Sequence, residues 1–318
     1  MAPYRAPGPT AQTPRYDVVV VGGGAAGLSA ALLLGRSRRS VLICDAGHPR
    51  NGGAISFNAY LSRDGSTPKD FRRICLGQLD RYPTVTRFKD TVKKVQTKPD
   101  GFAVQFAHHR PVVGRTILLA SGLIDELPPI RGLARLYGKV VHSCPYCHGW
   151  ECRGKRIGVV GSTRAAADLS VELGIWSSNV VLFTNGASIP AGQLKKLRLA
   201  GVEVVRTPVL RLSQTAGKQL AVHLRHAVSD SLAALFLSPR QHQRCPIAKA
   251  LGCKFSKKDG GIECNDRAFT GIPGVYAAGN ASKGIQLVVM AAAEGAAAAV
   301  AINEALLDQD LKKSKEAG

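Results

Sequence analysis

Near the start of the chain, a strand, a glycine-rich turn, a helix and an acidic residue follow one another, and this order constrains the fold more than any other feature. The β-branched run over 16–21 predicts a buried parallel strand. It leads through the turn 22–27 into an apolar helix over 28–34. A second strand, 40–44, ends at Asp45, where an acid that binds a ribose belongs. We therefore expect a βαβ unit that binds a dinucleotide.

The three glycines of this turn have different structural roles. Gly22 allows the tight turn, Gly24 lets a pyrophosphate approach the backbone, and Gly27 lets the helix pack closely on the strand. The N-terminus of the helix then faces the phosphates. A Gly-x-Gly-x-x-Gly pattern alone is weak, but strand, helix and acid in the right order make it specific.

A second unit of the same kind begins with the strand 155–160, and its glycine pattern is damaged. Gly161 keeps the first position, but Thr163 occupies the position where the backbone must approach a pyrophosphate. Ala166 is acceptable at the third. The residues 184–186 offer neither a carboxylate for a ribose nor arginines for a 2′-phosphate. We expect a nucleotide fold with weak or lost nucleotide affinity.

Two further segments suit contact with a cofactor. The strand 116–120 ends in Ser121 and Gly122. The glycine-limited strand 274–280 precedes an alanine-rich helix over about 286–307. A strand that enters a helix N-terminus suits a phosphate or a sugar hydroxyl, although small residues in the helix also serve close packing.

A Cys-x-x-Cys pair with a histidine behind it lies between the two nucleotide units. Cys144 and Cys147 can sit on one helical turn, where they can form a disulfide that opens and closes during turnover. A helix N-terminus lowers the pKa of a thiol, and Pro145 fits the first turn. The imidazole of His148 can exchange protons near neutral pH.

A structural zinc site is the usual competitor of such a pair. Zinc requires a second pair of ligands at comparable spacing. The later cysteines do not supply one: Cys245, Cys253 and Cys264. We expect redox chemistry and no metal.

The chain is strongly basic, with 43 Lys and Arg against 22 Asp and Glu and a formal net charge of +21. Such a surface attracts acidic partners, or is simply a solvated surface. Low aromatic content and the absence of a nucleic-acid-binding motif argue against nucleic acid.

Eight irregularly spaced cysteines are typical of a cytoplasmic protein. No apolar run of 18 residues predicts a membrane span, and 1–15 suggests a loose tail.

Together these motifs resemble the low-molecular-weight thioredoxin reductase family, and the resemblance covers the chain from Tyr16 to Leu307. It implies an α/β fold of two Rossmann-like domains, the second inserted in the first. An FAD domain would comprise 1–122 and 243–318, and a degenerate nicotinamide-type domain with the cysteine pair would comprise 123–242. The residues implied to bind FAD are Gly22, Gly24, Ala25, Ala26, Gly27, Asp45, Ala120, Ser121, Gly122, Gly279, Asn280, Gln286 and Leu287.

Three departures separate the chain from ordinary thioredoxin reductases. His148 replaces the usual aspartate after the second cysteine, Asn280 replaces the aspartate that binds the flavin ribityl chain, and the nicotinamide site lacks its central glycine and its arginines. Cys-x-x-Cys-His-Gly-aromatic-Glu resembles the branch that contains FAD-dependent dithiol oxidases. Reductases that take electrons from ferredoxin also have poor nicotinamide sites.

The resemblance implies that Cys147 lies against the flavin, that Cys144 exchanges with the substrate sulfur and that His148 moves the proton. Our first hypothesis is a homodimeric reductase of an acidic thioredoxin-like protein, with doubtful use of NADPH and a ferredoxin-type donor. The alternative is an oxidase that forms a disulfide in a small dithiol and passes electrons to oxygen. A third is a non-catalytic flavin redox sensor.

Overall fold

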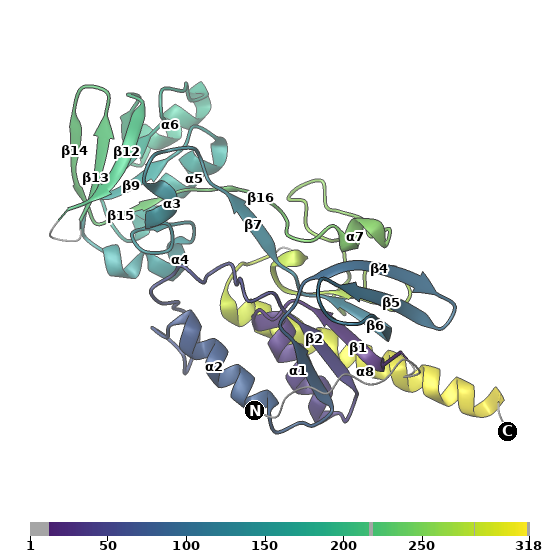
Figure 1. Ribbon diagram of the computed structural model, residues 1–318. Helices are drawn as coiled ribbons and strands as arrows, with labels where there is room; N and C mark the ends of the chain where they lie inside the picture. The colour runs from purple at the N-terminus through teal and green to yellow at the C-terminus, as the bar shows by residue number, and fades with distance from the viewer. Residues whose placement is uncertain (1–12, 216–218, 283, 317–318) are drawn as a thin grey trace. The chain divides into compact units, whose positions relative to one another are not determined.

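The computed structural model describes residues 13–215, 219–282 and 284–316. Residues 1–12, most of the expected tail, lie outside the described part. The chain divides into two compact units, each with its own sheet: unit 1 comprises Met1–Pro49, Arg73–Ile124 and Gln243–Gly318, and unit 2 comprises Arg50–Arg72 and Asp125–His242. Figure 1 shows the course of the chain through both units.

The elements of unit 1 are β1 (Arg15–Val21), α1 (Ala25–Arg36), β2 (Val41–Cys44), β3 (Val85–Phe88), β4 (Val92–Lys98), β5 (Gly101–Phe106), β6 (Val112–Leu119), α7 (Ile247–Ala250), β17 (Val275–Ala277), the 3₁₀ turn η3 (Gly279–Ala281) and α8 (Val288–Glu316). Those of unit 2 are α3 (Leu133–Leu136), β8 (Val141–His142), α4 (Pro145–His148), η1 (Trp150–Cys152), β9 (Ile157–Val160), α5 (Arg164–Glu172), η2 (Leu173–Ile175), β10 (Val180–Phe183), α6 (Ala191–Leu199), β11 (Glu203–Val205), β12 (Val209–Gln214), β13 (Leu220–Leu224), β14 (Val228–Leu232) and β15 (Ala234–Phe236). The segments that span the boundaries are α2 (Pro68–Leu79), β7 (Leu123–Glu126) and β16 (Arg240–Gln243).

A seven-stranded sheet of order β3-β2-β1-β6-β5-β4, with β17 also paired to β6, forms the centre of unit 1. β1 pairs in parallel with β2 and β6, and β6 pairs in parallel with β17. The four strands end level, because Val21 lies opposite both Cys44 and Leu119, and Leu119 lies opposite Ala277. The predicted strand–turn–helix–strand order is confirmed, and the expected α/β class is confirmed with it.

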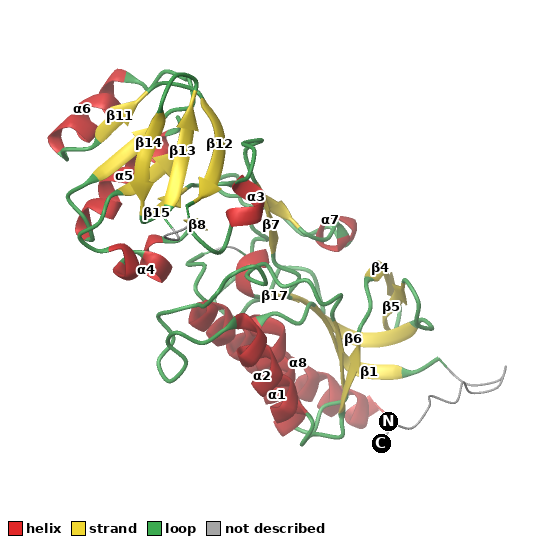
Figure 2. Ribbon diagram, turned by 60° about the vertical axis from the view of Figure 1, so that its left-hand side comes forward, coloured by secondary structure: helices red, strands yellow, loops and turns green. Residues whose placement is uncertain are grey.

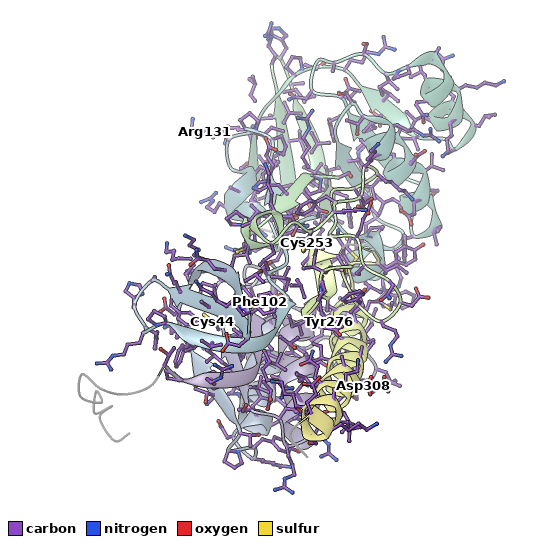
Figure 3. The ribbon with its side chains drawn as sticks, turned by 90° about the vertical axis from the view of Figure 1, so that its right-hand side faces the viewer. Cys44, Phe102, Arg131, Cys253, Tyr276 and Asp308 are labelled. Carbon is purple, nitrogen blue, oxygen red and sulfur yellow. A yellow bond between two sulfur atoms is a disulfide. The ribbon has the colours of Figure 1, made fainter. Side chains whose placement is uncertain are left out.

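The two faces of this sheet carry two separate cores. On one face, α1 and α8 cover a core that includes Val18, Leu118 and Tyr276. On the other face, Phe102 and Cys253 pack with residues of α7. Figure 3 labels Phe102, Cys253 and Tyr276. Apolar residues on both sides of β1 and β6 match the continuous runs expected of a parallel sheet.

The long helix α8 packs against α1 so closely that only glycine fits at their contact. A Cβ added to Gly295 would lie 2.0 Å from the carbonyl oxygen of Ala26. Figure 1 shows α8, in yellow, running alongside α1. The helix begins two residues later and ends nine residues later than the sequence predicted, because polar residues after Leu307 extend it without a buried face.

By length and composition alone, α8 is also apolar enough to cross a membrane, with a mean hydropathy of 1.4 over 18 residues. The sequence predicted no such helix, because Glu294 interrupts the apolar run. Core helices pass the same test, and α8 buries Ala298, Ile302 and Leu306 in the core that it shares with α1. In the described residues it is the one helix that meets this criterion.

Unit 2 contains a parallel five-stranded sheet of order β11-β10-β9-β15-β8 and an antiparallel sheet of order β12-β13-β14. Figure 2 shows the strands β12, β13 and β14 side by side. The helices α5 and α6 cover one face of the parallel sheet. The predicted second βαβ unit is thus confirmed, with β10 at the expected residues.

The two compact units differ in one segment from the two domains expected from sequence. The breaks at Ile124 and Gln243 lie within two residues of the expected limits. Residues 50–72, however, group with unit 2, whereas we expected them in the FAD domain. Their contacts explain it: the amide of Ile55 donates to the carbonyl of Gly138, and the side chain of Asn58 donates to the carbonyl of Cys147.

The close packing of α1 and α8 makes a testable prediction. Gly295→Ala places a methyl group against the backbone of Ala26, and we expect it to lower the free energy of unfolding by about 1–3 kcal/mol. Equilibrium chemical denaturation measures the change. Gly77→Ala in α2 is the matched control, because a Cβ there meets no atom within 4 Å and alanine favours the helix. Equal stability of Gly295→Ala and the unmutated protein would contradict the described packing.

Candidate functional site

The residues predicted to bind a cofactor gather at one edge of the sheet of unit 1. Because β2, β1, β6 and β17 are parallel and end level, the residues that follow them share the carboxyl edge, where ligands of such sheets bind. Backbone hydrogen bonds join the strand ends: Gly22 N–H donates to Cys44, and Ala120 N–H donates to Val21. The residues brought together after these strands are Gly22, Asp45, Ala120, Ser121, Gly122, Gly279 and Asn280.

The first turn is shaped by contacts that allow no side chain. Gly22 has φ of 111°, and a Cβ there would lie 2.3 Å from the carbonyl oxygen of Ala120. A Cβ on Gly27 would lie 1.9 Å from the carbonyl oxygen of Gly22. Gly24 differs, because a Cβ there would meet no atom within 4 Å. The backbone at Gly24 therefore faces open space, as an approaching phosphate requires.

The N-terminus of α1 has free hydrogen-bond donors for a ligand. Gly24 is its N-cap and offers no side-chain cap. The amides of the first turn, which begins at Ala25 and Ala26, therefore have no side-chain acceptor at the cap. An uncapped helix N-terminus stabilises an anion. Asp45 lies beside this turn, since its carboxylate comes within 2.9 Å of a Cβ added to Gly23.

The turn after β17 is held by a carboxylate that the sequence analysis missed. Glu294 Oε2 in α8 accepts hydrogen bonds from Gly279 N–H at 2.8 Å and from Ser282 Oγ at 3.3 Å. Burial raises the pKa of Glu294. Gln286 and Leu287 lie between η3 and α8, and the carbonyl of Leu287 accepts from Ala291 N–H. Glu294 was recognisable only as a lone acid in an alanine-rich helix.

The second glycine turn has the opposite arrangement. Thr163 is the N-cap of α5, and its Oγ1 accepts a hydrogen bond from Ala166 N–H at 3.2 Å. That amide is thus already satisfied by the protein. Gly161 keeps a backbone with φ of 146°, where a Cβ would lie 2.9 Å from Ala166 Cβ. The turn keeps its shape, while its helix N-terminus offers fewer donors than that of α1.

Cys144 and Cys147 form a disulfide with an S–S distance of 2.07 Å, as predicted. Cys144 is the N-cap of α4 and Pro145 is the first residue of that helix, also as predicted. The amide of Cys147 donates to Cys144 Sγ at 3.1 Å. Both cysteines are half-buried, so exposure alone does not distinguish the two sulfurs.

A second histidine, absent from the sequence prediction, stacks on His148. The ring of His142, at the end of β8, lies 3.9 Å from that of His148 between centroids, with the planes at 28°. Burial lowers the pKa of His142 to about 3. Burial also lowers the pKa of His148, and the nearby carboxylate of Glu151 partly opposes this. Five residues lie between the two histidines in the sequence, and a two-residue strand gives no sequence signal for the contact.

Electrostatics allow the histidine pair at most one positive charge. Two unit charges about 4 Å apart repel by about 4 kcal/mol at the effective dielectric of a partly buried site. Because His142 is the more buried ring, it stays neutral and His148 is the ring that can take a proton. At neutral pH the site therefore holds an uncharged imidazole next to the disulfide, in the state of a base.

Asn58 is the third residue that the sequence did not indicate. Its Nδ2 donates to the carbonyl of Cys147 at 2.7 Å and to Glu151 Oε1 at 3.3 Å. It thereby connects the helix of the disulfide to the carboxylate that acts on His148. The neighbouring thiol of Cys152 is buried, and burial raises its pKa to about 11, which disfavours thiolate chemistry there.

The two sites differ in what they can do chemically. The strand edge of unit 1 can hold a nucleotide cofactor through backbone amides and Asp45. The disulfide of unit 2 can exchange with a thiol while His148 takes up a proton. No group of three or more metal-ligating side chains occurs among the described residues.

The chain is similar to known disulfide oxidoreductases over most of its length. The family model described as pyridine nucleotide-disulphide oxidoreductase matches residues 16–295. Thioredoxin reductase sirT of Leptosphaeria maculans is 27% identical over 93% of this chain and 96% of its own. A probable thioredoxin reductase of Arthroderma benhamiae is 37% identical over 54% of this chain, and the match spans 44% of that relative.

Among solved structures, that of HlmI superposes with a TM-score of 0.90 at 34% identity, over 95% of this chain and 96% of that one. The resemblance seen in the sequence is thereby confirmed, and so is the fold of two Rossmann-like domains. Membership of this family implies that the chain binds FAD. The chain belongs to the pyridine nucleotide-disulphide oxidoreductases, as a thioredoxin reductase-like FAD flavoprotein and a flavin-dependent disulfide oxidoreductase.

Proposed function

We propose that this chain oxidises a dithiol at the Cys144–Cys147 disulfide, through FAD, without depending on NADPH. The observation that carries the proposal is the imidazole of His148 directly after a formed disulfide, stacked on His142 in a setting where burial lowers the pKa of His148 and favours its neutral form. A thiol that attacks a disulfide must lose its proton, and a neutral imidazole can accept it. The sequence alone favoured the reductase direction; in the oxidised protein the attacking thiol comes from the substrate, and the neutral form of His148 can accept its proton.

The turn geometry of unit 1 fits FAD. The open space at Gly24 and the uncapped N-terminus of α1 suit the pyrophosphate, and Asp45 suits the adenosine ribose. Asn280 can bond a hydroxyl of the ribityl chain. When bound, FAD would supply a two-electron acceptor for the reduced cysteines, with oxygen as the final acceptor and hydrogen peroxide as the product.

Disulfide exchange at the two cysteines takes two electrons from the substrate. One substrate thiol loses its proton to a ring nitrogen of His148, and its sulfur attacks Cys144 Sγ. The Cys144–Cys147 bond breaks, and Cys147 leaves as a thiolate. The second substrate thiol then attacks the mixed disulfide, its proton passes to the leaving sulfur of Cys144, and the oxidised substrate is released. Two electrons and two protons thus leave the substrate, and the overall reaction consumes one dithiol and one oxygen molecule.

Weak use of NADPH follows from the second turn. Thr163 caps α5 with its own side chain, so the amide of Ala166 is occupied. Arg164 is exposed and pairs with Asp168. The residues 184–186 supply no ribose-binding acid. These features support a nicotinamide-type domain that retains its shape and has lost most of its affinity.

The reductase remains the second candidate, and the net charge of +21 favours it. A basic surface speeds encounter with an acidic protein, such as a thioredoxin-like acceptor or a ferredoxin-type donor. The relatives named thioredoxin reductase point to the same partner class. Location in the cytoplasm and assembly as a homodimer stay predictions of the sequence.

An anaerobic spectral titration separates these directions. We expect a small dithiol such as dithiothreitol to bleach the flavin absorbance, NADPH and NADH to bleach it slowly or not at all, and air to restore it rapidly. Rapid bleaching by NADPH would contradict the loss of the nicotinamide site. Bleaching by the dithiol with slow recovery in air would contradict the oxidase and favour a protein donor.

The cysteines predict a sharp contrast among three variants. Cys144→Ser and Cys147→Ser each remove the disulfide, so we expect dithiol-driven bleaching to fall by a factor of about 10³ or more, as for other essential nucleophiles. Cys152→Ser is the matched control, because this buried thiol is protonated at neutral pH, and it should retain the rate. Retained rates in both disulfide variants would leave a non-catalytic flavin sensor as the better explanation.

The open space at Gly24 predicts a loss of FAD without a loss of fold. Gly24→Val directs its side chain into that space, so we expect the affinity for FAD to fall at least about tenfold, which corresponds to about 1.4 kcal/mol. Flavin content per protein and the melting temperature of the apoprotein are the two measurements. Unchanged flavin content would show that the phosphates do not approach this turn.

A further inference from the structure

His142 contacts His148 through the face of its ring. The centroids lie 3.9 Å apart with the planes at 28°, which is a stacked arrangement. On its other contact, His142 meets Phe236 at 5.6 Å and 48°. His142 is 8% exposed, so water has little access to this ring. The ring of His142, on β8, thus packs against the ring of His148, which directly follows the disulfide.

Hydrogen bonding does not explain this contact. Nδ1 of His142 is buried and meets no hydrogen-bond partner among the described residues. An unpartnered buried nitrogen usually destabilises a protein. His142 therefore interacts with His148 through the face of its ring, and burial keeps that ring uncharged.

The other groups around His148 are few. From η1, the carboxylate of Glu151 raises the pKa of His148. The Nζ of Lys155 donates to the backbone carbonyl of Glu151. The thiol of Cys152 is held protonated by burial, and Asn58 is a neutral donor to Glu151. The disulfide does not titrate. Among these groups, Glu151 favours the protonated form of His148, and burial opposes it.

We propose that His142 is a positioning residue whose neutral, buried ring supports the imidazolium of His148 when His148 takes up a proton beside the disulfide. A cation placed over an aromatic face is stabilised by the ring electrons, more strongly where water is excluded. The same stack fixes the plane of the His148 ring. The proposal rests on the proposed function for the source of that proton, and the coupling between the rings is measurable without turnover.

The test compares two replacements that fill the same space. His142→Phe keeps an aromatic face and removes the unpartnered nitrogen. His142→Leu fills the space without an aromatic face. The titration midpoint of the His148 ring is followed by NMR in the oxidised, FAD-loaded protein, with His148→Asn to assign the signal. Glu151→Gln is a positive control, because loss of the carboxylate should lower the midpoint.

We expect His142→Leu to lower the midpoint of His148 by about 0.5–1 pH unit, since it removes stabilisation of the charged form. We expect His142→Phe to leave the midpoint within about 0.2 pH unit of the unmutated protein, because its face replaces that of His142. An unchanged midpoint in His142→Leu would overturn the proposal. An equal fall in both variants would also overturn it, because the aromatic face would then be irrelevant.

Kinetics of flavin bleaching by dithiothreitol separate this inference from the proposed function. With His148 as the base, the rate should fall as the pH drops through the midpoint of His148, and in His142→Leu that fall should move to lower pH by the same amount. At pH above both midpoints, His142→Leu should be about 3–10-fold slower, because its base is weaker. The midpoints of His148 could shift as expected while the pH dependence of the bleaching rate stays unchanged. That result would refute the role of His148 as the base and would still support the contact between the two rings.

Discussion

The whole nucleotide-binding edge of unit 1 depends on backbone contacts that leave no room for a side chain. Gly27 of α1 lies against the backbone of Gly22, and Gly295 of α8 lies against the backbone of Ala26 in α1. The helix N-terminus is therefore fixed between the sheet and a second helix, and its free amides keep one direction. A preorganised set of donors binds an anion without first ordering itself. The same contacts bring Glu294 close enough to hold the turn at Gly279.

The chain contains two turns of the same design, and a single residue type separates their chemistry. At Gly24 the N-cap has no side chain, so the amides of α1 are left for a ligand. At Thr163 the N-cap closes on its own helix. Capping by threonine typically stabilises a helix by about 1 kcal/mol. In α5 the cap therefore stabilises the helix and occupies an amide that a ligand would otherwise bind. This arrangement is consistent with a domain whose main role is to carry the Cys144–Cys147 disulfide.

Local sequence patterns were sufficient for much of the fold and for part of the site. The strand over 16–21, its turn and Asp45 are adjacent in sequence, and the spacing of Cys144 and Cys147 was enough to predict their disulfide. Contacts between distant segments were not predictable in this way. Asn58 reaches Cys147 across 89 residues, and the segment 50–72 joined unit 2 for the same reason. His142 lies near in sequence, but a two-residue strand has no periodicity that would reveal its buried ring.

Surface charge and buried charge act on different steps. The net charge of +21 raises the rate of encounter with an acidic molecule, and salt screens it beyond about 8–10 Å. The histidine pair is shielded from solvent, so its state depends on burial and on Glu151. In either direction of electron flow a thiol attacks a disulfide, so one proton must be removed from the attacking thiol and one returned to the leaving sulfur. A neutral imidazole beside an intact disulfide can take the proton of an external attacking thiol, which supports the proposed oxidation of a dithiol, whereas the surface charge acts on the encounter that precedes the chemistry.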